Sequence, residues 1–118
     1  MVVGMYSLPW MIAGNFNEIL LREDKYRGQA VNTVRALRFQ ECLNNYGMID
    51  LGFSGPRYTW SNHRPLTHLI QERIDRVFAN ADWNVLYPDA SVKHLERAHS
   101  DHNLVLLSLA NVSKMQFT

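Results

Sequence analysis

Two short polar clusters near opposite ends of the chain hold the side chains best suited to hydrolytic chemistry. Gly14-Asn15-Phe16-Asn17 follows an apolar run, and Ser100-Asp101-His102-Asn103 opens another. Polar residues at strand ends often converge into one active site although they lie far apart in the sequence. Carboxylate and amide oxygens suit a hard cation such as Mg²⁺, and an imidazole can hydrogen-bond a phosphate oxygen. These residues therefore indicate phosphodiester hydrolysis as the candidate chemistry.

Asp75 is the internal carboxylate that best fits an orienting role beside His102. It lies in the alternating run from Glu72 to Ala79, which is typical of a strand. Each candidate also has a simple structural explanation. Asn15 and Asn17 can build a turn, and Asp75 can form a surface ion pair with a neighbouring arginine. It is the combination of these residues that favours a functional site.

The elements that must position these side chains follow from hydrophobic periodicity and turn residues. Trp10 to Ala13 predicts a buried strand, and a helix is expected from Asn32 or Thr33 to a C-terminal cap at Gly47. Further strands are predicted at 48–51, 57–61, 72–79, 91–95 and 104–109, with a short helical turn capped by Asn80 and stopped by Pro88. Few connections are long enough for a helical crossover. We therefore predict an α+β fold with a mostly antiparallel sheet and one unfinished face or edge.

Length and composition set broad limits. The chain has 118 residues, 47% hydrophobic and 19% charged, which fits one globular domain. A net charge of +1 gives no overall attraction to nucleic acid. The basic residues are spread through the chain with acidic residues between them, so we assign most charges to a solvated surface. Cys42 is the only cysteine, which excludes an internal disulfide and favours a reducing compartment; we expect it to be buried. No signal peptide or membrane span is predicted, so we expect an intracellular protein, in the nucleus or cytoplasm.

The set of motifs resembles the C-terminal half of the endonuclease/exonuclease/phosphatase superfamily, and most closely the endonuclease domain of plant LINE-type (non-LTR) retrotransposons. The matching stretches are Pro9–Leu20, Tyr58–Asn62, Glu72–Asn80 and Ser100–Asn103, in the order the family has them. The resemblance implies a partial layered sandwich, with about one of its two mostly antiparallel sheets and the flanking helices. Residues 1–118 would then form a single partial domain that lacks its N-terminal half.

The resemblance also implies a role for each matched residue. His102 corresponds to the histidine that stabilises the phosphoryl transition state, and Asp75 to the aspartate that holds it. Asn17 corresponds to the asparagine that contacts the scissile phosphate, and Asp101 to the aspartate near the metal. The implied cofactor is Mg²⁺ and the implied partner is DNA. Asn15 stands where the family has an aspartate that activates or positions the attacking water.

Two departures from the family pattern lead us to predict impaired or lost activity. Asn15 cannot accept a proton near pH 7, and loss of a catalytic base costs about 10²–10⁴-fold in rate. The family's N-terminal half, with its metal-ligating glutamate, has no counterpart before Met1. We therefore expect poor Mg²⁺ binding.

Three interpretations stay open. In the first, the chain is a Mg²⁺-dependent endonuclease that works with an N-terminal half or with a reverse transcriptase module of its parent element. In the second, it is a catalytically dead remnant. In the third, it is a non-enzymatic module that binds nucleic acid or protein. Tyr58 and Trp60 are expected to pack in the core first and to contact a ligand second. Arg57 and Arg64, which flank them, could contact a nucleic-acid backbone.

Overall fold

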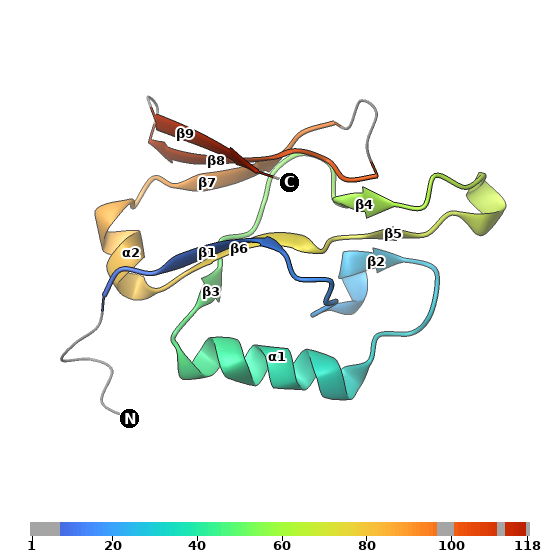
Figure 1. The fold of residues 1–118 in the computed structure, drawn as a ribbon, viewed down its shortest axis with the longest axis horizontal. Helices are drawn as coiled ribbons and strands as arrows, with labels where there is room; N and C mark the ends of the chain where they lie inside the picture. The colour runs from blue at the N-terminus through green and yellow to red at the C-terminus, as the bar shows by residue number, and fades with distance from the viewer. Residues whose placement is uncertain (1–7, 97–100, 111–112, 118) are drawn as a thin grey trace.

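The computed structural model describes residues 8–96, 101–110 and 113–117. Three layers lie one above another: helix α1, a sheet containing β1 and β6, and a second sheet containing β7 and β8 (Figure 1). The elements, in chain order, are β1 (Met11–Asn15), the 3-10 helix η1 (Arg22–Asp24), β2 (Lys25–Tyr26), α1 (Thr33–Asn45), β3 (Ile49–Asp50), β4 (Trp60–Ser61), the 3-10 helix η2 (Leu66–His68), β5 (Gln71–Glu72), β6 (Asp75–Ala79), α2 (Ala81–Leu86), β7 (Ser91–His94), β8 (Val105–Ala110) and β9 (Ser113–Phe117).

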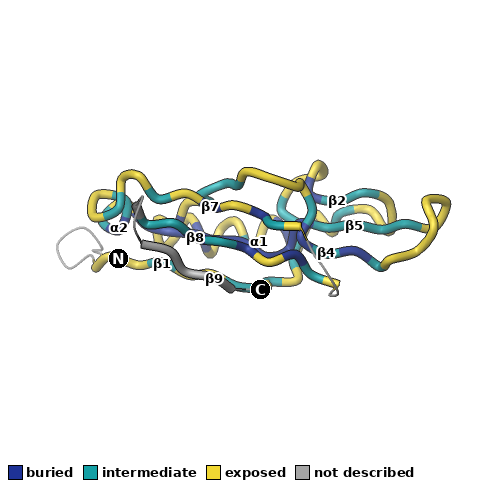
Figure 2. The backbone as a smooth tube through the Cα atoms, turned by 90° about the horizontal axis from the view of Figure 1, so that it is seen from above, coloured by how far each residue is buried: buried dark blue, intermediate teal, exposed yellow. Residues whose placement is uncertain are grey.

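Each of the three described sheets contains three antiparallel strands. Their strand orders are β1-β6-β3, β2-β5-β4 and β7-β8-β9. Strand β5 leads directly into β6, so the second of these sheets continues the line of the first (Figure 1). The molecule measures 52 × 38 × 16 Å. The shortest dimension runs from strand to strand within the narrow β7-β8-β9 sheet (Figure 2).

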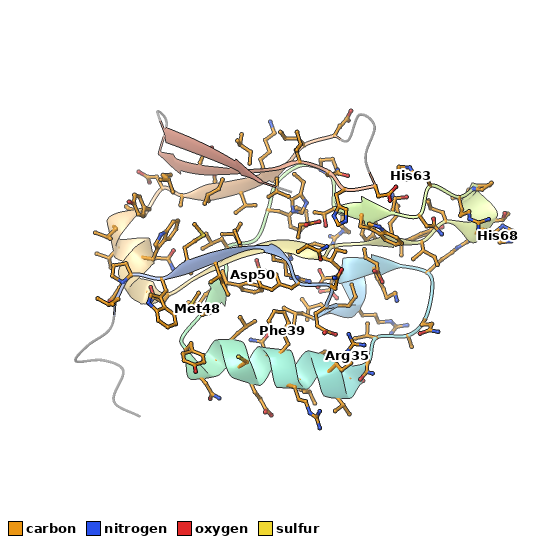
Figure 3. The ribbon with its side chains drawn as sticks, in the orientation of Figure 1. Arg35, Phe39, Met48, Asp50, His63 and His68 are labelled. Atoms are coloured by element: carbon orange, nitrogen blue, oxygen red, sulfur yellow. The ribbon has the colours of Figure 1, made fainter. Side chains whose placement is uncertain are left out.

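Alternate residues of β6 face the two neighbouring layers, because successive side chains of a strand point to opposite faces. Val77 and Ala79 pack against the β7-β8-β9 sheet, in a core that also contains Trp83, Val92, Val105 and Leu107. Phe78 faces α1, in a second core that contains Leu43 and Met48, with Phe16, Leu20 and Phe39 at its edge. Phe39 points from α1 toward the sheet (Figure 3). Strand β6 is therefore the central element that both cores share.

Both helices begin at an asparagine whose side chain accepts a hydrogen bond from the helical backbone. Asn32 caps α1 and Asn80 caps α2, and each bonds the backbone N–H three residues further on. Gly47, at φ 64°, follows the end of α1 in the left-handed conformation that glycine tolerates best. The helix boundaries predicted from the sequence are confirmed.

The α+β class and the antiparallel pairing are also confirmed, but the sheet arrangement differs from the prediction. We expected about one sheet, and the described residues form three. Within the expected strand 57–61, the buried residues are Thr59 and Ser61, whereas Tyr58 and Trp60 are half-buried. The prediction that Tyr58 and Trp60 pack first in the core was wrong, because the strand presents its opposite face to the interior.

Two further findings concern exposure. Cys42 is exposed on α1, so the prediction that it is buried was wrong. It lies next to Leu43, which takes the inward position at this point of the helix. No helix in the described part of the chain is long and apolar enough to cross a membrane.

Candidate functional site

Asp75 and His102 form the centre of the candidate site. The imidazole Nδ1 of His102 lies 2.7 Å from Oδ2 of Asp75. The side chain of Asp75 is fully buried, whereas 26% of the His102 side chain is exposed. A carboxylate oxygen can only accept, so Nδ1–H donates and Nε2 lies on the opposite side of the ring. The contact expected between these two residues is present.

Thr59 fixes the backbone that carries Asp75. Its hydroxyl oxygen accepts from the backbone N–H groups of Ile74, at 3.0 Å, and Asp75, at 3.1 Å. Thr59 is fully buried, so its hydroxyl satisfies two N–H groups that water does not reach. It therefore holds the start of β6 in place at the point where Asp75 meets His102.

The segment with His102 is held by the strand that contains Trp60. Trp60 and His102 form an antiparallel bridge. The N–H of Asn103 donates to the Thr59 carbonyl at 2.7 Å, and the N–H of Ser61 donates to the Asp101 carbonyl at 3.1 Å. Thr59 thus binds both halves of the pair, Asp75 through its side chain and the His102 segment through its backbone.

Asn15 reaches the site because β1 pairs with β6. In this register Asn15 lies opposite Asp75, and directly opposite residues of an antiparallel pair place their side chains on the same face. Oδ1 of Asn15 accepts from the N–H of Asn17 at 2.8 Å, and Asn17 has a left-handed backbone with φ 52°. The turn interpretation of these two asparagines is therefore correct for their backbone, and it leaves both side chains at the exposed end of β1.

Asp101 lies at the exposed rim of the site rather than inside it. Its side chain is 69% exposed, and Oδ1 lies 3.1 Å from Nε2 of His63. Figure 3 shows His63 beside β4, while His68 lies at the far tip of the β4–β5 hairpin. His63 is a neighbour of the site that the sequence did not reveal, because the loop that holds it has no strand or helix pattern.

The described residues do not form a complete binding site for a divalent cation. No group of three or more His, Cys, Asp or Glu side chains in residues 8–96, 101–110 and 113–117 is placed to hold a metal ion. Asp101 is paired with His63, and Asp75 faces His102. Mg²⁺ prefers octahedral oxygen coordination, for which this set is too small. The described residues therefore do not by themselves fit the implied cofactor.

Two polar atoms near the site are buried and have no hydrogen-bond partner in the part of the chain that the structure describes. They are Oδ1 of Asp75 and Oδ1 of Asn103. Buried acceptors without a partner are uncommon in proteins and are found at strained or functional positions. Asp75 lies opposite Asn15 in the β1–β6 pair. A hydrogen-bond donor on the side chain at position 15 would therefore lie on the same face of the sheet as Oδ1 of Asp75, and a donor on a bound molecule could approach from that face.

A buried cluster of ion pairs lies on the α1 side of β6. Arg76 is 1% exposed and pairs with Asp24, and with Asp50 at 2.8 Å. Arg73 lies 2.9 Å from Asp50 and 3.7 Å from Asp24. The prediction of a solvated surface was wrong for these two arginines, because Asp24 and Asp50 pair with them inside the fold.

Comparison of the chain with protein-family models, with curated proteins and with solved structures finds no match. The assignment of a function therefore depends on the residues of the site and on their geometry.

Proposed function

We propose that this chain carries the histidine–aspartate part of a phosphodiesterase site of the endonuclease/exonuclease/phosphatase type, with DNA as the substrate. The observation that carries the proposal is the 2.7 Å contact between Nδ1 of His102 and the fully buried Asp75. A buried carboxylate that fixes an imidazole tautomer is a recurrent arrangement where the second ring nitrogen contacts a reacting group. The sequence resemblance to LINE-type endonucleases supports the same chemistry.

In the proposed reaction His102 is the catalytic residue and Asp75 is a positioning residue. When the ring is protonated both nitrogens donate, so Nε2–H can bind a phosphoryl oxygen while Nδ1–H holds Asp75. A donor aimed at the oxygen that gains negative charge stabilises the transition state. Asn17, two residues after the end of β1, is the proposed contact to the phosphate.

Position 15 limits the proposed activity. An amide cannot take a proton from water, and Oδ1 of Asn15 already accepts from Asn17. Asp101 is the residue that the resemblance places near the Mg²⁺ ion, but the described residues contain no group of three or more His, Cys, Asp or Glu side chains that could hold one. The chain is therefore proposed to bind phosphodiesters and to cleave them slowly.

The experiment compares the nicking of supercoiled plasmid DNA, with Mg²⁺ and with EDTA, by the wild-type chain, Asn15→Asp and Asn15→Asp/His102→Gln. We expect Asn15→Asp to nick faster than wild type by about 10²-fold, since it restores a carboxylate opposite Asp75. His102→Gln should remove the gain. Equal rates for all three proteins, or nicking that survives His102→Gln, would contradict the proposal.

A non-enzymatic role is the second candidate, favoured by the neutral Asn15 and by the small ligand set. In that case none of the three proteins cleaves plasmid DNA. DNA binding, measured by fluorescence anisotropy with a labelled duplex, would still weaken with rising salt and on His102→Gln. Absence of both cleavage and salt-sensitive binding would exclude both candidates.

A further inference from the structure

We propose that a groove between α1 and the segment that contains β2 binds a short, acidic, amphipathic segment of another protein. The groove has a volume of about 900 Å³. It is lined by Leu20–Arg22, by Lys25 and residues 27–31, and by Thr33, Ala36, Leu37 and Gln40 of α1. Its lining residues include neither Asp75 nor His102, and α1, which forms one wall, lies on the opposite side of the β1-β6-β3 sheet from β7 and β8 (Figure 1).

The groove presents apolar side chains that the fold itself does not cover. Leu21 is 53% exposed and Leu37 is 57% exposed, although both line it. Leu20, Ala30, Val31 and Ala36 complete the apolar surface. Contiguous exposed apolar surface with a polar rim is characteristic of interaction sites. Because Leu21 and Leu37 are more than half exposed, a protein segment can cover this surface better than a small molecule that needs an enclosed pocket.

The charge of the groove selects the kind of segment. Arg22, Lys25 and Arg27 line it, and none of its lining residues in the described part of the chain is Asp or Glu. Lys25 lies 3.4 Å from Glu72, so its charge is partly balanced from outside the groove. Arg27 donates to the neutral carbonyl of Leu66 at 2.8 Å, which leaves its charge in place. In a chain with 12 basic and 11 acidic residues, this is a local excess that favours a negatively charged partner.

The wall opposite α1 is held in shape before any partner binds. Strand β2 pairs with β5, with Lys25 opposite Glu72 and Tyr26 opposite Gln71. Gly28 packs so closely on Ile70 that an added Cβ would lie 3.3 Å from its Cγ2. A second hollow of about 300 Å³ shares Leu20, Leu21 and Gln40 with the groove and extends the surface along α1 to Leu43. The α1 residues that line the two hollows run from Thr33 to Asn44, which is about three helical turns, so an amphipathic helix of about three turns can lie alongside them.

The test uses a labelled amphipathic peptide of about 15 residues built from Leu, Ala and Glu, and a twin in which Lys replaces every Glu. Binding to the full chain is measured by fluorescence anisotropy at low and moderate salt. We expect the Glu peptide to bind and the Lys twin to bind at least tenfold more weakly, with the difference reduced by salt. Equal affinity for the twins, or no binding of the Glu peptide, overturns the proposal.

Two pairs of matched variants locate the site. Leu37 and Val34 are both 57% exposed on α1, but only Leu37 lines the groove. Leu37→Gln should weaken the Glu peptide about tenfold, and Val34→Gln should leave it unchanged. Arg22→Gln should weaken it about threefold, whereas Arg38→Gln, which changes an arginine of α1 outside the groove, should not.

The remaining outcomes also decide the question. Equal effects of Leu37→Gln and Val34→Gln would show that the peptide binds elsewhere and would overturn the proposal. Binding of a DNA duplex that depends on Arg22 but not on Leu37, without binding of the Glu peptide, would assign the groove to nucleic acid and would overturn it too. Circular dichroism of each variant confirms that α1 is intact.

Discussion

His94 is a deeply buried residue with a titratable ring, so its protonation affects the stability of the fold. It is 1% exposed, and its Nδ1 lies 2.7 Å from the Pro56 carbonyl oxygen. Its ring stacks on Phe53 with the ring centroids 4.4 Å apart, and the Arg73 guanidinium lies over the Phe53 ring at 4.6 Å from the centroid. Gly55 approaches the His94 carbonyl so closely that an added Cβ would collide with it. Burial lowers the pKa of His94 below its ordinary value, and the charge of Arg73 lowers it further.

The lowered pKa predicts that acid destabilises the fold through His94. The unfolded chain takes up this proton near pH 6.5, whereas the folded chain resists it. The stability contribution of neutral His94 is therefore complete above about pH 6.5 and declines as the pH falls toward the lower, folded-state pKa. His94→Phe keeps the stacking and removes the titration. Urea unfolding at several pH values should show that the stability advantage of wild type over His94→Phe shrinks on acidification; a constant difference would contradict the prediction.

The residues of the candidate site differ in how far the sequence could predict them. The pairing of Asp75 with His102 followed from residue type and from the family resemblance. Thr59 could not be recognised, since a threonine between two aromatic residues looks like an outward position until the strand's inward face is known. His63 reaches Asp101 from a loop, and loop geometry leaves little pattern in the sequence.

At the scale of elements, Asn80 joins three parts of the chain. Its Oδ1 accepts from the N–H of Trp83, which caps α2, and from the N–H of Trp10 just before β1. Its Nδ2 donates to the Leu8 carbonyl at 2.6 Å. The Asn80 side chain, predicted from the sequence as a helix cap, therefore also connects α2 to the residues that precede β1.

Asn80→Ala should cost about 2–4 kcal/mol of unfolding free energy, because the cap and two further hydrogen bonds are lost at an 8% exposed position. Asn32→Ala is the matched control, since Asn32 caps α1 with one bond, at 3.1 Å, on an exposed surface. It should cost about 1 kcal/mol. Chemical denaturation of both variants tests this, and equal losses would count against the tying role of Asn80.

Helices were predictable where capping residues mark their ends, whereas the pairing of strands was harder to predict. The caps at Asn32, Asn80 and Gly47 placed both helices correctly. The run 72–79 became β5 and β6, because Thr59 takes the N–H groups of Ile74 and Asp75 at the junction. Strand β2 has only two residues and was not foreseen, since tertiary pairing with β5 rather than propensity forms it.

At the scale of the whole molecule, β6 holds two cores together, and the buried ion cluster lies on its α1 side. Arg76 and Asp24 are 1% and 2% exposed, and they connect the β6 strand to a segment 52 residues earlier in the chain. Charged residues are almost never fully buried unless they are paired, so a sequence pattern alone assigns them to the surface. This is why the cluster escaped prediction.

Arg76→Met should destabilise the fold by about 3–5 kcal/mol, since it leaves the Asp24 carboxylate buried without its main partner. Arg35→Met is the control, because Arg35 forms a 3.1 Å ion pair with Glu18 but has a 60% exposed side chain. That change should cost less than about 1 kcal/mol. The double variant Arg76→Met/Asp24→Asn should lose less than the sum of its single changes. A strictly additive double variant would contradict a coupled cluster.

The most direct test of the Asp75–His102 site is the tautomer of the neutral His102 ring, read by ¹⁵N nuclear magnetic resonance. We expect the Nδ1–H tautomer, with its proton held by Asp75, and a shift toward the Nε2–H tautomer in Asp75→Asn. An Nε2–H tautomer in the wild-type chain, or a spectrum unchanged by Asp75→Asn, would contradict it.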